Sequence, residues 1–499
     1  MFSLRWLFVP MFLWLACDLP FSTKPSEEEA LFLVTHDYDG RVIRHKTAIT
    51  ISWSDITIED FKEYHIEKAK IIADDYYWVN LAQLPDSLAT SYIDTLDDDG
   101  TFQYRVRVID QHDQYRHELS NELIVPDVHA LVIPDDYDNV EEAFYTKFLD
   151  EEDSLLIAPG EYNGNYSFMD KNIIIYSIDG PVTTILHGIA NLQSVVEINS
   201  GKLNGFTIVD GIGVSGGGVW VQGDGIIINC IIKNNRAVES PDANLQIYPY
   251  GYGGGIYGTD MAQIRNCTIF QNSSRRGGAG VLLDQYAQII NCTIKSNLIE
   301  IPPPGESPYS GGGAFVSNRS IAVLMRNCIL SNNWSRRHGG GIMIDGQVQF
   351  TNCILNNNMA HSGGGGVAVG HGNFSQITNC VFFDNGSVYY SDEFNTFWVE
   401  GNISIMNSII DYTIDLITNN NRFYGIHASY CDITDSYIAP GEGNIPDDPK
   451  FVDSRNGDFH LRTQSPCRNS GNPGNEYNDS NGSRNDMGAY GGPYGDDWE

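Results

Sequence analysis

The chain has 499 residues, of which 41% are hydrophobic, and its 64 acidic and 30 basic side chains give a formal net charge of −34. This length allows two or more domains. The excess of negative charge disfavours nucleic acid and anionic membrane surfaces as partners, because both attract basic faces. Two interpretations of the charge remain open: solubility in a salty exterior, or cation binding by clustered acidic residues.

The N-terminus has the pattern of an export signal. Arg5 precedes an apolar segment, 6–16, which is too short to span a membrane as a mature helix, and Cys17 follows directly. This arrangement resembles a bacterial lipoprotein signal, although Trp14 departs from the pattern, and it implies acylation of Cys17; simple secretion is the alternative. We expect a protein at the outer membrane, at the cell surface or secreted, which contacts membrane only through a lipid anchor, with residues 18–29 as a linker.

Residues 30–127 have a different sequence pattern, in which short runs alternate between apolar and polar residues, such as 49–55 and 102–110. Runs of this length and spacing are typical of a β-sandwich. The stretch resembles a fibronectin type III domain, with Trp53 in the place of the core tryptophan and Tyr104 in the strand of the tyrosine corner. The resemblance implies a spacer or docking domain, so we expect no catalysis there.

From residue 205 to about 412 the chain repeats one frame. An Asn-Cys pair recurs, a second asparagine follows each cysteine by five positions, and a glycine cluster then leads to a short apolar run. The shortest steps between cysteines are near 25 residues, which leaves no room for a helix pair, so each repeat is expected to be one coil of a parallel β-helix. The cysteines are Cys230, Cys267, Cys292, Cys328, Cys353 and Cys380, and the asparagines are Asn235, Asn272, Asn297, Asn333, Asn358 and Asn385.

The segment before these repeats, 132–188, resembles the first coils of secreted right-handed β-helix proteins of the pectin-lyase-like superfamily. The resemblance implies a short helix at about Asn139–Phe148 that caps the first coil, whose backbone groups would otherwise be unpaired. Residues 441–499 resemble the C-terminal closing segment of many such bacterial proteins. We therefore expect an all-β protein, in which a β-sandwich precedes a right-handed parallel β-helix, a solenoid, over residues 128–440.

Alternation along the strands places each repeated cysteine on the same face as the apolar residue two positions later, for example Cys267 and Ile269. We expect these cysteines to be buried as small hydrophobes; a disulfide ladder and a metal site are the alternatives. The asparagines are expected at turns, in left-handed backbone and in a hydrogen-bonded ladder, with the glycine clusters at the next corner. Cys431 and Cys467 lie past the regular coils, and we predict a disulfide between them; two separate buried thiols are the alternative.

A basic strip defines the first candidate site. Two insertions, 237–252 and 298–310, enter at the same register and would wall a groove on one side of the helix. The residues expected on its floor are Arg236, Arg275, Arg276, Arg336, Arg337, His338 and His361. Arginines pair with carboxylates and aromatic faces pack on sugar rings, so the strip suits an acidic or neutral sugar chain. The alternative is that the arginines pair with nearby acidic residues at the surface.

Three residues are candidates for chemistry. Asp284 and Asp345 share a register directly after apolar triplets, where they could act as acid and base partners or calcium ligands; solvated turn acids are the alternative. His371 lies in a Gly-His-Gly triplet that resembles one motif of polygalacturonase-like hydrolases, but the other motifs of those enzymes are missing. No cofactor is implied, although calcium is possible. A loosely calcium-like spacing of Asp479, Asn481 and Asp486 lacks the complete loop frame.

These observations favour an exported bacterial surface protein that binds extracellular polysaccharide or acts as an adhesin, without turnover. The alternative is a polysaccharide lyase or glycoside hydrolase that acts on an acidic glycan in the groove. The fold supports both functions and does not choose between them. Two carboxylates about 5–10 Å apart that face the groove would favour hydrolysis.

Overall fold

The computed structural model describes most of the chain from residue 153 onward and shorter stretches before it. The described residues are 11–15, 47–53, 61–72, 75–86, 89, 91–96, 100–111, 115–119, 123–125, 130–134, 139–145, 153–239, 251–301, 310–370, 374–388, 396–411, 425–433 and 441–498. Cys17 and His371 lie outside them, as do 240–250 and 302–309, which form most of the two insertions.

The N-terminal part forms two small sheets that share no strand with the coils. The three-stranded sheet consists of β1 (Met11–Leu15), which falls in the expected signal, β2 (Thr47–Trp53) and β5 (Ser91–Leu96). The other sheet is antiparallel and consists of β3 (Phe61–Ile72), β4 (Asp75–Leu84), β6 (Gly100–Asp110), β7 (Tyr115–Leu119) and β8 (Leu123–Val125). Tyr104 is fully buried and its hydroxyl donates to Asp94 at 2.8 Å. The fibronectin type III resemblance stays a prediction.

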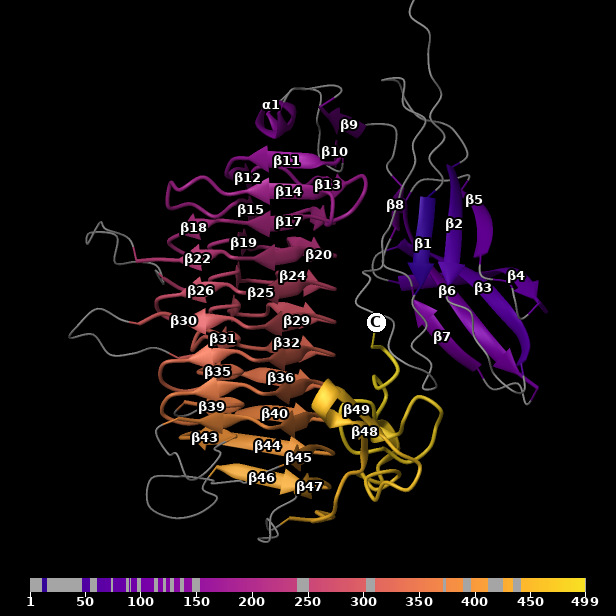
Figure 1. The fold of residues 1–499 in the computed structure, drawn as a ribbon, viewed down its shortest axis with the longest axis vertical. Coiled ribbons are helices and arrows are strands. Elements are labelled where there is room, and N and C mark those ends of the chain that lie inside the picture. Colours follow the sequence, from indigo (N-terminus) through magenta and orange to yellow (C-terminus); the bar gives the residue numbers. More distant parts are fainter. Residues whose placement is uncertain are drawn as a thin grey trace, which may run out of the picture.

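Stacked coils follow, and four parallel sheets run along the stack (Figure 1). The first sheet consists of β9 (Ala130–Ile133), β10 (Ser154–Ile157), β13 (Ile174–Ser177), β16 (Lys202–Asn204), β20 (Ile226–Ile228), β24 (Gln263–Arg265), β28 (Gln288–Ile290), β32 (Val323–Arg326), β36 (Val348–Thr351), β40 (Phe374–Thr378), β44 (Asn402–Met406) and β46 (Ile426–Ser429). The second consists of β11 (Gly160–Asn163), β14 (Thr184–His187), β17 (Thr207–Val209), β21 (Ile231–Lys233), β25 (Thr268–Phe270), β29 (Thr293–Lys295), β33 (Ile329–Ser331), β37 (Ile354–Asn356), β41 (Val381–Phe383), β45 (Ile409–Asp411) and β47 (Asp432–Ile433).

The other two sheets complete each coil. The third sheet consists of β12 (Tyr166–Phe168), β15 (Val196–Ile198), β19 (Val219–Val221), β23 (Ile256–Gly258), β27 (Val281–Leu283), β31 (Ala314–Val316), β35 (Ile342–Ile344), β39 (Val367–Val369) and β43 (Phe397–Val399). The fourth, built from two-residue strands, consists of β18 (Ile212–Gly213), β22 (Arg236–Ala237), β26 (Ser273–Ser274), β30 (Leu298–Ile299), β34 (Trp334–Ser335), β38 (Met359–Ala360) and β42 (Gly386–Ser387). In the coils from β16 to β43 the order is first, second, fourth and third sheet, so the fourth-to-third corner carries the glycine clusters.

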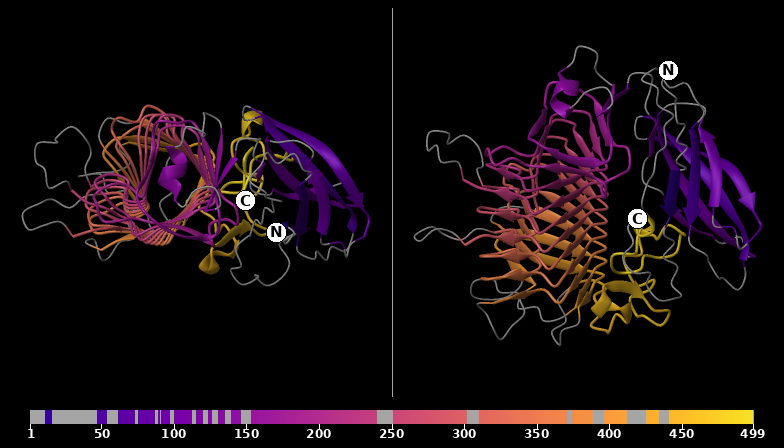
Figure 2. Two further views of the ribbon diagram at one scale, coloured as in Figure 1. Left: turned by 90° about the horizontal axis from the view of Figure 1, so that it is seen from above. Right: turned by 45° about the horizontal axis from the view of Figure 1, so that its top comes forward.

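A short helix covers the N-terminal end of the stack, as the sequence predicted. Helix α1 (Val140–Phe144) is shorter than expected, and the side chain of Asn139 caps it by accepting from the Glu142 backbone N–H. Figure 2 shows the helix from above, within the outline of the coils. Phe144 is 2% exposed and packs on Phe168 with ring centroids 5.0 Å apart, so the helix seals the apolar interior of the first coil.

The six repeated cysteines line the interior as a column of thiols, which confirms the expected burial. The Cys353 thiol, for example, donates to the Thr351 carbonyl at 3.2 Å and accepts the Cys328 backbone N–H at 3.4 Å. The column continues through Ser408, whose hydroxyl accepts the Cys380 N–H at 3.0 Å and donates to the Met406 carbonyl at 2.9 Å. The side chain at each of these positions therefore accepts a hydrogen bond from a backbone N–H of the preceding coil.

The asparagine ladder is also present. Asn297 is 1% exposed, and its backbone N–H and its Nδ2 both donate to Asn333 Oδ1 at 3.0 Å. The same Nδ2 donates to the Ile269 carbonyl at 3.0 Å, and Asn297 Oδ1 accepts two bonds from Asn272. One detail of the prediction was wrong, because left-handed backbone occurs at the residue before each ladder asparagine, such as Gln271 with φ 55°, and at the asparagine before each cysteine.

The C-terminal segment contains β48 (Phe451–Asp453), β49 (Asp458–Leu461) and the 3₁₀ helices η1 (Ser454–Asn456) and η2 (Asn475–Tyr477). It lies beside the later coils in Figure 1, against the outer face of the second sheet. Asn352 Nδ2 donates to the carbonyls of Ala489 and Gly491 at 2.8 and 2.7 Å, which ties the segment to the coils. The segment therefore covers the side of the solenoid.

The predicted disulfide between Cys431 and Cys467 is absent, and both thiols are free and buried. Cys431 continues the interior column, where its thiol donates to the Ser429 carbonyl at 3.2 Å. Cys467 belongs to a separate apolar cluster between the second sheet and the C-terminal segment, and its thiol donates to Asp432 at 2.9 Å. The prediction was wrong because the two residues lie in different cores.

Candidate functional site

The basic strip follows the fourth sheet, at the corner that leads to the third sheet. Arg275, Glu300 and His361 continue the fourth-sheet ladder at one register, since their backbone N–H groups donate to the carbonyls of the preceding coils at 2.9–3.2 Å. Arg336 and Arg337 follow Ser335 as Arg275 and Arg276 follow Ser274, with Ser335 and Ser274 both on that ladder. The shared turn expected from the sequence is therefore confirmed.

Ion pairs occupy part of this strip, in agreement with the alternative that its arginines pair with nearby acidic residues. Arg236 makes two hydrogen bonds to Glu300 at 2.5 and 2.7 Å, and Arg275 lies 4.0 Å from the same carboxylate. Arg276 pairs with Glu239 at 2.9 Å. Desolvation raises the Glu300 pKa, but the hydrogen bonds from Arg236 and Ser273 and the charges of Arg236 and Arg275 together lower it below its usual value. Arg236 and Arg275 are thus paired with one carboxylate, which lies one coil beyond Arg275 and two coils beyond Arg236.

A pocket of about 300 Å³ opens beside the strip on the outer face of the third sheet. Its lining residues are Tyr252, Arg276, Ser310, Phe315, Arg337, His338, Met343, Asp345, Gly370, Trp398 and Glu400. Phe315, Met343 and Trp398 occupy the outward middle position of their strands β31, β35 and β43. The glycine corner supplies the basic wall of the pocket, and the turn after the third sheet supplies the acidic wall.

Aromatic rings pack in pairs in this pocket. His338 stacks on Trp398 with centroids 3.8 Å apart and ring planes within 9°, and Tyr252 stacks on Phe315 at 5.7 Å. One ring of each pair lies on the third sheet, Phe315 on β31 and Trp398 on β43. These strands are three strand spacings apart, which corresponds to about 14 Å. Flat apolar surfaces at this separation are suited to sugar rings, and the basic wall beside them is suited to carboxylates on those rings.

His338 is a buried polar residue within the pocket. Its side chain is 8% exposed, and its Nδ1 has no hydrogen-bond partner among the described residues. Burial and the neighbouring Arg337 charge lower the pKa of His338 to about 4, against a contact with the Gly363 backbone that raises it. The imidazole is therefore neutral at pH 7. Its Nδ1 is a polar atom at the side of the pocket that is shielded from solvent.

Asp345 is half-buried in the acidic wall. Burial is the largest cause of its raised pKa, the Glu400 charge raises it further, and the Arg337 charge opposes the increase. Asp345 and Glu400 follow β35 and β43 at one register, and Gly370 occupies the same register on the strand between them. The two carboxyl groups therefore face the same space from positions two strand spacings apart, roughly 9–10 Å along the sheet.

Several predicted residues do not reach the pocket. Asp284 shares the register of Asp345, as expected, but it is fully buried in an ion pair with Arg319 and accepts from Ser317 Oγ at 2.8 Å. Its carboxylate is therefore buried away from the pocket, and the candidate catalytic role of Asp284 stays a prediction. Arg336 stacks on the Trp334 ring at 3.9 Å, and His361 Nδ1 lies 3.4 Å from Ser362 Oγ; neither residue lines the pocket.

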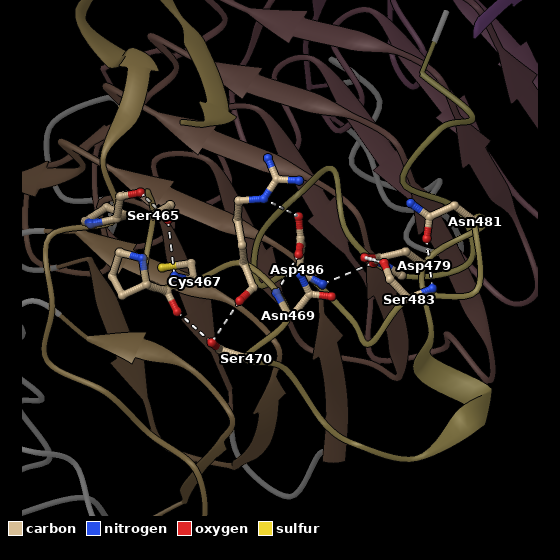
Figure 3. A network of polar contacts seen from close by, with 12 residues as sticks. Ser465, Cys467, Asn469, Ser470, Asp479, Asn481, Ser483 and Asp486 are labelled. Atoms are coloured by element: carbon tan, nitrogen blue, oxygen red, sulfur yellow. Dashed lines mark hydrogen bonds and ion pairs between the residues drawn. The ribbon is translucent and has the colours of Figure 1, made fainter. Parts of the chain in front are cut away.

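The calcium-like frame near the C-terminus has a structural explanation (Figure 3). Asp479 accepts from the backbone N–H groups of Asp486 and Gly492 at 3.1 and 2.7 Å, and Asp486 accepts from the Asn469 N–H at 2.6 Å. Asn481 accepts from the Ser483 N–H at 2.8 Å. Within the described part of the chain, no group of three or more His, Cys, Asp or Glu residues is arranged to hold a metal ion.

Trp398 and Glu400 line the pocket but were not among the candidate site residues identified from the sequence. Phe397-Trp398-Val399 followed by Glu400 repeats the pattern of the triplet 342–344 followed by Asp345. The glycine cluster that marks this corner in other coils is missing from 391–396, so the register was lost. The triplet alone, with an acidic residue after it, is the signal that could have identified both residues.

Comparison with a family model supports the architecture of the coils. Residues 190–404 match the family model described as right handed beta helix region, and no curated protein matches the chain. Pectin methylesterase from carrot aligns with TM-score 0.33 and 12% identity, covering 55% of this chain and 87% of that protein. A pectin methylesterase in complex with a hexasaccharide gives 0.31 and 11%, covering 67% and 98%. A PL6 family alginate lyase gives 0.27 and 12%, covering 67% and 55%. At these scores the likenesses carry no information about activity.

The described helices are too short to cross a bilayer, since α1 has 5 residues and no described helix combines sufficient length with apolar character.

Proposed function

We propose that the β-helix binds an acidic polysaccharide in the pocket on the third sheet. The observation that carries the proposal is that Arg276 and Arg337 line the same pocket as the stacked rings of His338 and Trp398. In a chain with a net charge of −34, Arg276 and Arg337 place two positive charges in a pocket with aromatic faces, opposite the acidic wall formed by Asp345 and Glu400. The arginine wall supplies donors for sugar carboxylates, and the rings supply apolar faces for the sugar.

The expected setting is the outside of a bacterial cell. The signal-like N-terminus with Cys17 favours export and a lipid anchor, and residues 30–127 act as a fibronectin type III-like spacer that holds the solenoid away from the membrane. In this arrangement the protein is an adhesin or a glycan receptor. Labelling with a radioactive fatty acid tests the anchor: the wild type should incorporate the label, and a Cys17→Ala variant should not.

Binding of acidic polysaccharides to the purified chain tests the main proposal. Polygalacturonate, alginate and hyaluronan are titrated calorimetrically at low and high salt. An Arg337→Gln variant should bind the preferred polysaccharide about 10-fold or more weakly, because a charge-assisted hydrogen bond contributes about 1.5–3 kcal/mol. Arg455→Gln is the matched control, since Arg455 is exposed on the C-terminal segment. Equal affinities of wild type and Arg337→Gln for every polysaccharide would contradict the proposal.

A further inference from the structure

The corner between the first and second sheets carries an outer column of asparagines, one residue before each position of the cysteine column. They share left-handed backbone with φ of 51–53°, and they are Asn229, Asn266, Asn291, Asn327, Asn352, Asn379 and Asn407. The last four are at most 2% exposed, where the C-terminal segment lies beside the later coils (Figure 1). The first three are only half-buried, so this part of the column remains accessible to solvent.

The C-terminal segment shows what this column binds. Asn379 Nδ2 donates to the carbonyl of Asp486 at 3.2 Å. Asn327 Nδ2 donates to the carbonyl of Tyr494 at 3.4 Å, and Asn352 on the coil between them makes the two bonds described above. Side-chain amides of three successive coils therefore hold the backbone carbonyls of one polypeptide segment.

Two side chains of the coils add contacts with rings of the same segment. The Arg326 guanidinium lies over the Tyr494 ring, 4.4 Å from its centroid. Phe383 packs on Phe459 with ring centroids 5.4 Å apart. The interface with the C-terminal segment thus combines asparagine amides with a cation and an aromatic ring on the coils.

The earlier coils repeat these three elements where the C-terminal segment does not cover them. Arg265 occupies the same row of the first sheet as Arg326, two strands earlier. Phe270 occupies the same row of the second sheet as Phe383. We call this surface the open corner face, and its residues are Lys233, Arg265, Asn266, Phe270, Asn291 and Lys295.

Positive charge distinguishes the open corner face from the covered part of the corner. Lys233 and Lys295 flank Phe270, with ammonium nitrogens 6.0 and 5.8 Å from its ring centroid. Neither lysine makes an ion pair within the described part of the chain. The next two positions of this row are Ser331 and Asn356, which are uncharged. In a chain with a net charge of −34, this face therefore favours an acidic partner.

We propose that the open corner face docks an acidic polypeptide segment of a partner protein. The Asn266 and Asn291 amides, which make no hydrogen bond to another described residue, donate to backbone carbonyls of that segment. Lys233 and Lys295 pair with its carboxylates, and Phe270 packs on an apolar or aromatic side chain. Two observations select this occupant: the face continues an interface that already holds a polypeptide segment, and its charge is complementary to an acidic one. None of its residues lines the pocket on the third sheet, so the inference is independent of the proposed function.

A synthetic peptide with the sequence of residues 485–498 is the probe. It carries three aspartates and no basic residue, and it contains carbonyls that the covered asparagines already bind. The fluorescently labelled peptide is titrated with the full chain, and its anisotropy is measured at low and high salt. We expect saturable binding that weakens as salt is added, because the ion pairs with the lysines are screened. A peptide with asparagine in place of the three aspartates should bind about 10-fold or more weakly.

Variants of the full chain assign the binding to the open corner face. The double variant Lys233→Gln and Lys295→Gln should bind the acidic peptide about 10-fold or more weakly. Asn291→Gly, which preserves the left-handed backbone, should weaken binding about 3-fold or more. The matched control is the double variant Lys450→Gln and Arg455→Gln, which removes the same charge from exposed positions of the C-terminal segment and should bind as the wild type does.

Four results would overturn the proposal. They are absence of peptide binding, equal binding of the acidic and the neutral peptide, unchanged affinity in the lysine double variant, and loss of binding in Asn352→Gly alone, which would mean that the peptide displaces the C-terminal segment from its own seat. Sedimentation of the chain without peptide examines a second copy as occupant. Self-association that disappears in the lysine double variant would assign the face to that copy and would also overturn the proposal.

Discussion

Removing one amide from the asparagine ladder should destabilise the solenoid by about 2–4 kcal/mol. In an Asn297→Ala variant, the Asn272 backbone N–H and the Ile269 carbonyl lose a side-chain partner, and Asn272 Nδ2 and Asn333 Oδ1 each lose one bond. A buried polar group left without a partner costs about 1–3 kcal/mol. Asn297 is 1% exposed, so water cannot replace the lost bonds without opening the coil.

Urea unfolding followed by tryptophan fluorescence measures this change. Asn402→Ala is the matched control, because Asn402 is exposed at the start of β44 and its replacement should change stability by less than about 0.5 kcal/mol. Since each coil contacts its neighbours along the stack, the loss should also lower hydrogen-exchange protection in the coils next to Asn297. If Asn297→Ala unfolds at the same urea concentration as Asn402→Ala, the ladder bonds do not stabilise the solenoid and the reasoning is refuted.

Three further predictions concern the interior and the pocket. Cys353→Ser should cost less than about 1 kcal/mol in urea unfolding, because Ser408 already makes the same two hydrogen bonds in this column; a loss above about 3 kcal/mol would contradict this reading. The buried ladder thiols, together with Cys431 and Cys467, should resist a thiol reagent in the folded protein and react after unfolding; rapid labelling of the native protein would place them at the surface. Between pH 6.5 and about 4 the unfolded chain binds a proton at His338 that the folded chain excludes. The free energy of unfolding of the wild type should therefore fall by on the order of 3 kcal/mol relative to that of His338→Phe as the pH falls through this range. If the two free energies of unfolding change with pH in parallel, the low pKa of His338 is disproved.

The repeats made the fold predictable from sequence. In a parallel coil stack, equivalent residues lie directly above one another, so a pattern such as Asn-Cys with a second asparagine five positions on specifies both ladders and the face that they occupy. The cap at α1 was expected from the resemblance of residues 132–188 to the first coils of known β-helix proteins, and its physical reason is that the first coil needs a cover for its open end. The disulfide prediction was wrong because Cys431 fits the repeat without the asparagine that marks the other cysteines, so its place in the column was not recognised.

The chain sequence by itself determined the architecture, the buried thiols, the asparagine ladder and the common register of Arg275 with Arg336 and of Asp284 with Asp345. The tertiary structure decided which of these residues are neutralised: Glu300 occupies the coil between the two arginine pairs, and Arg319 reaches Asp284 from the turn that follows Ser317. It also brought Trp398 and Glu400 next to Arg337 across coils of unequal length. Backbone stacking follows a local repeat, whereas ion pairs and the pocket depend on where long side chains from different coils meet in space.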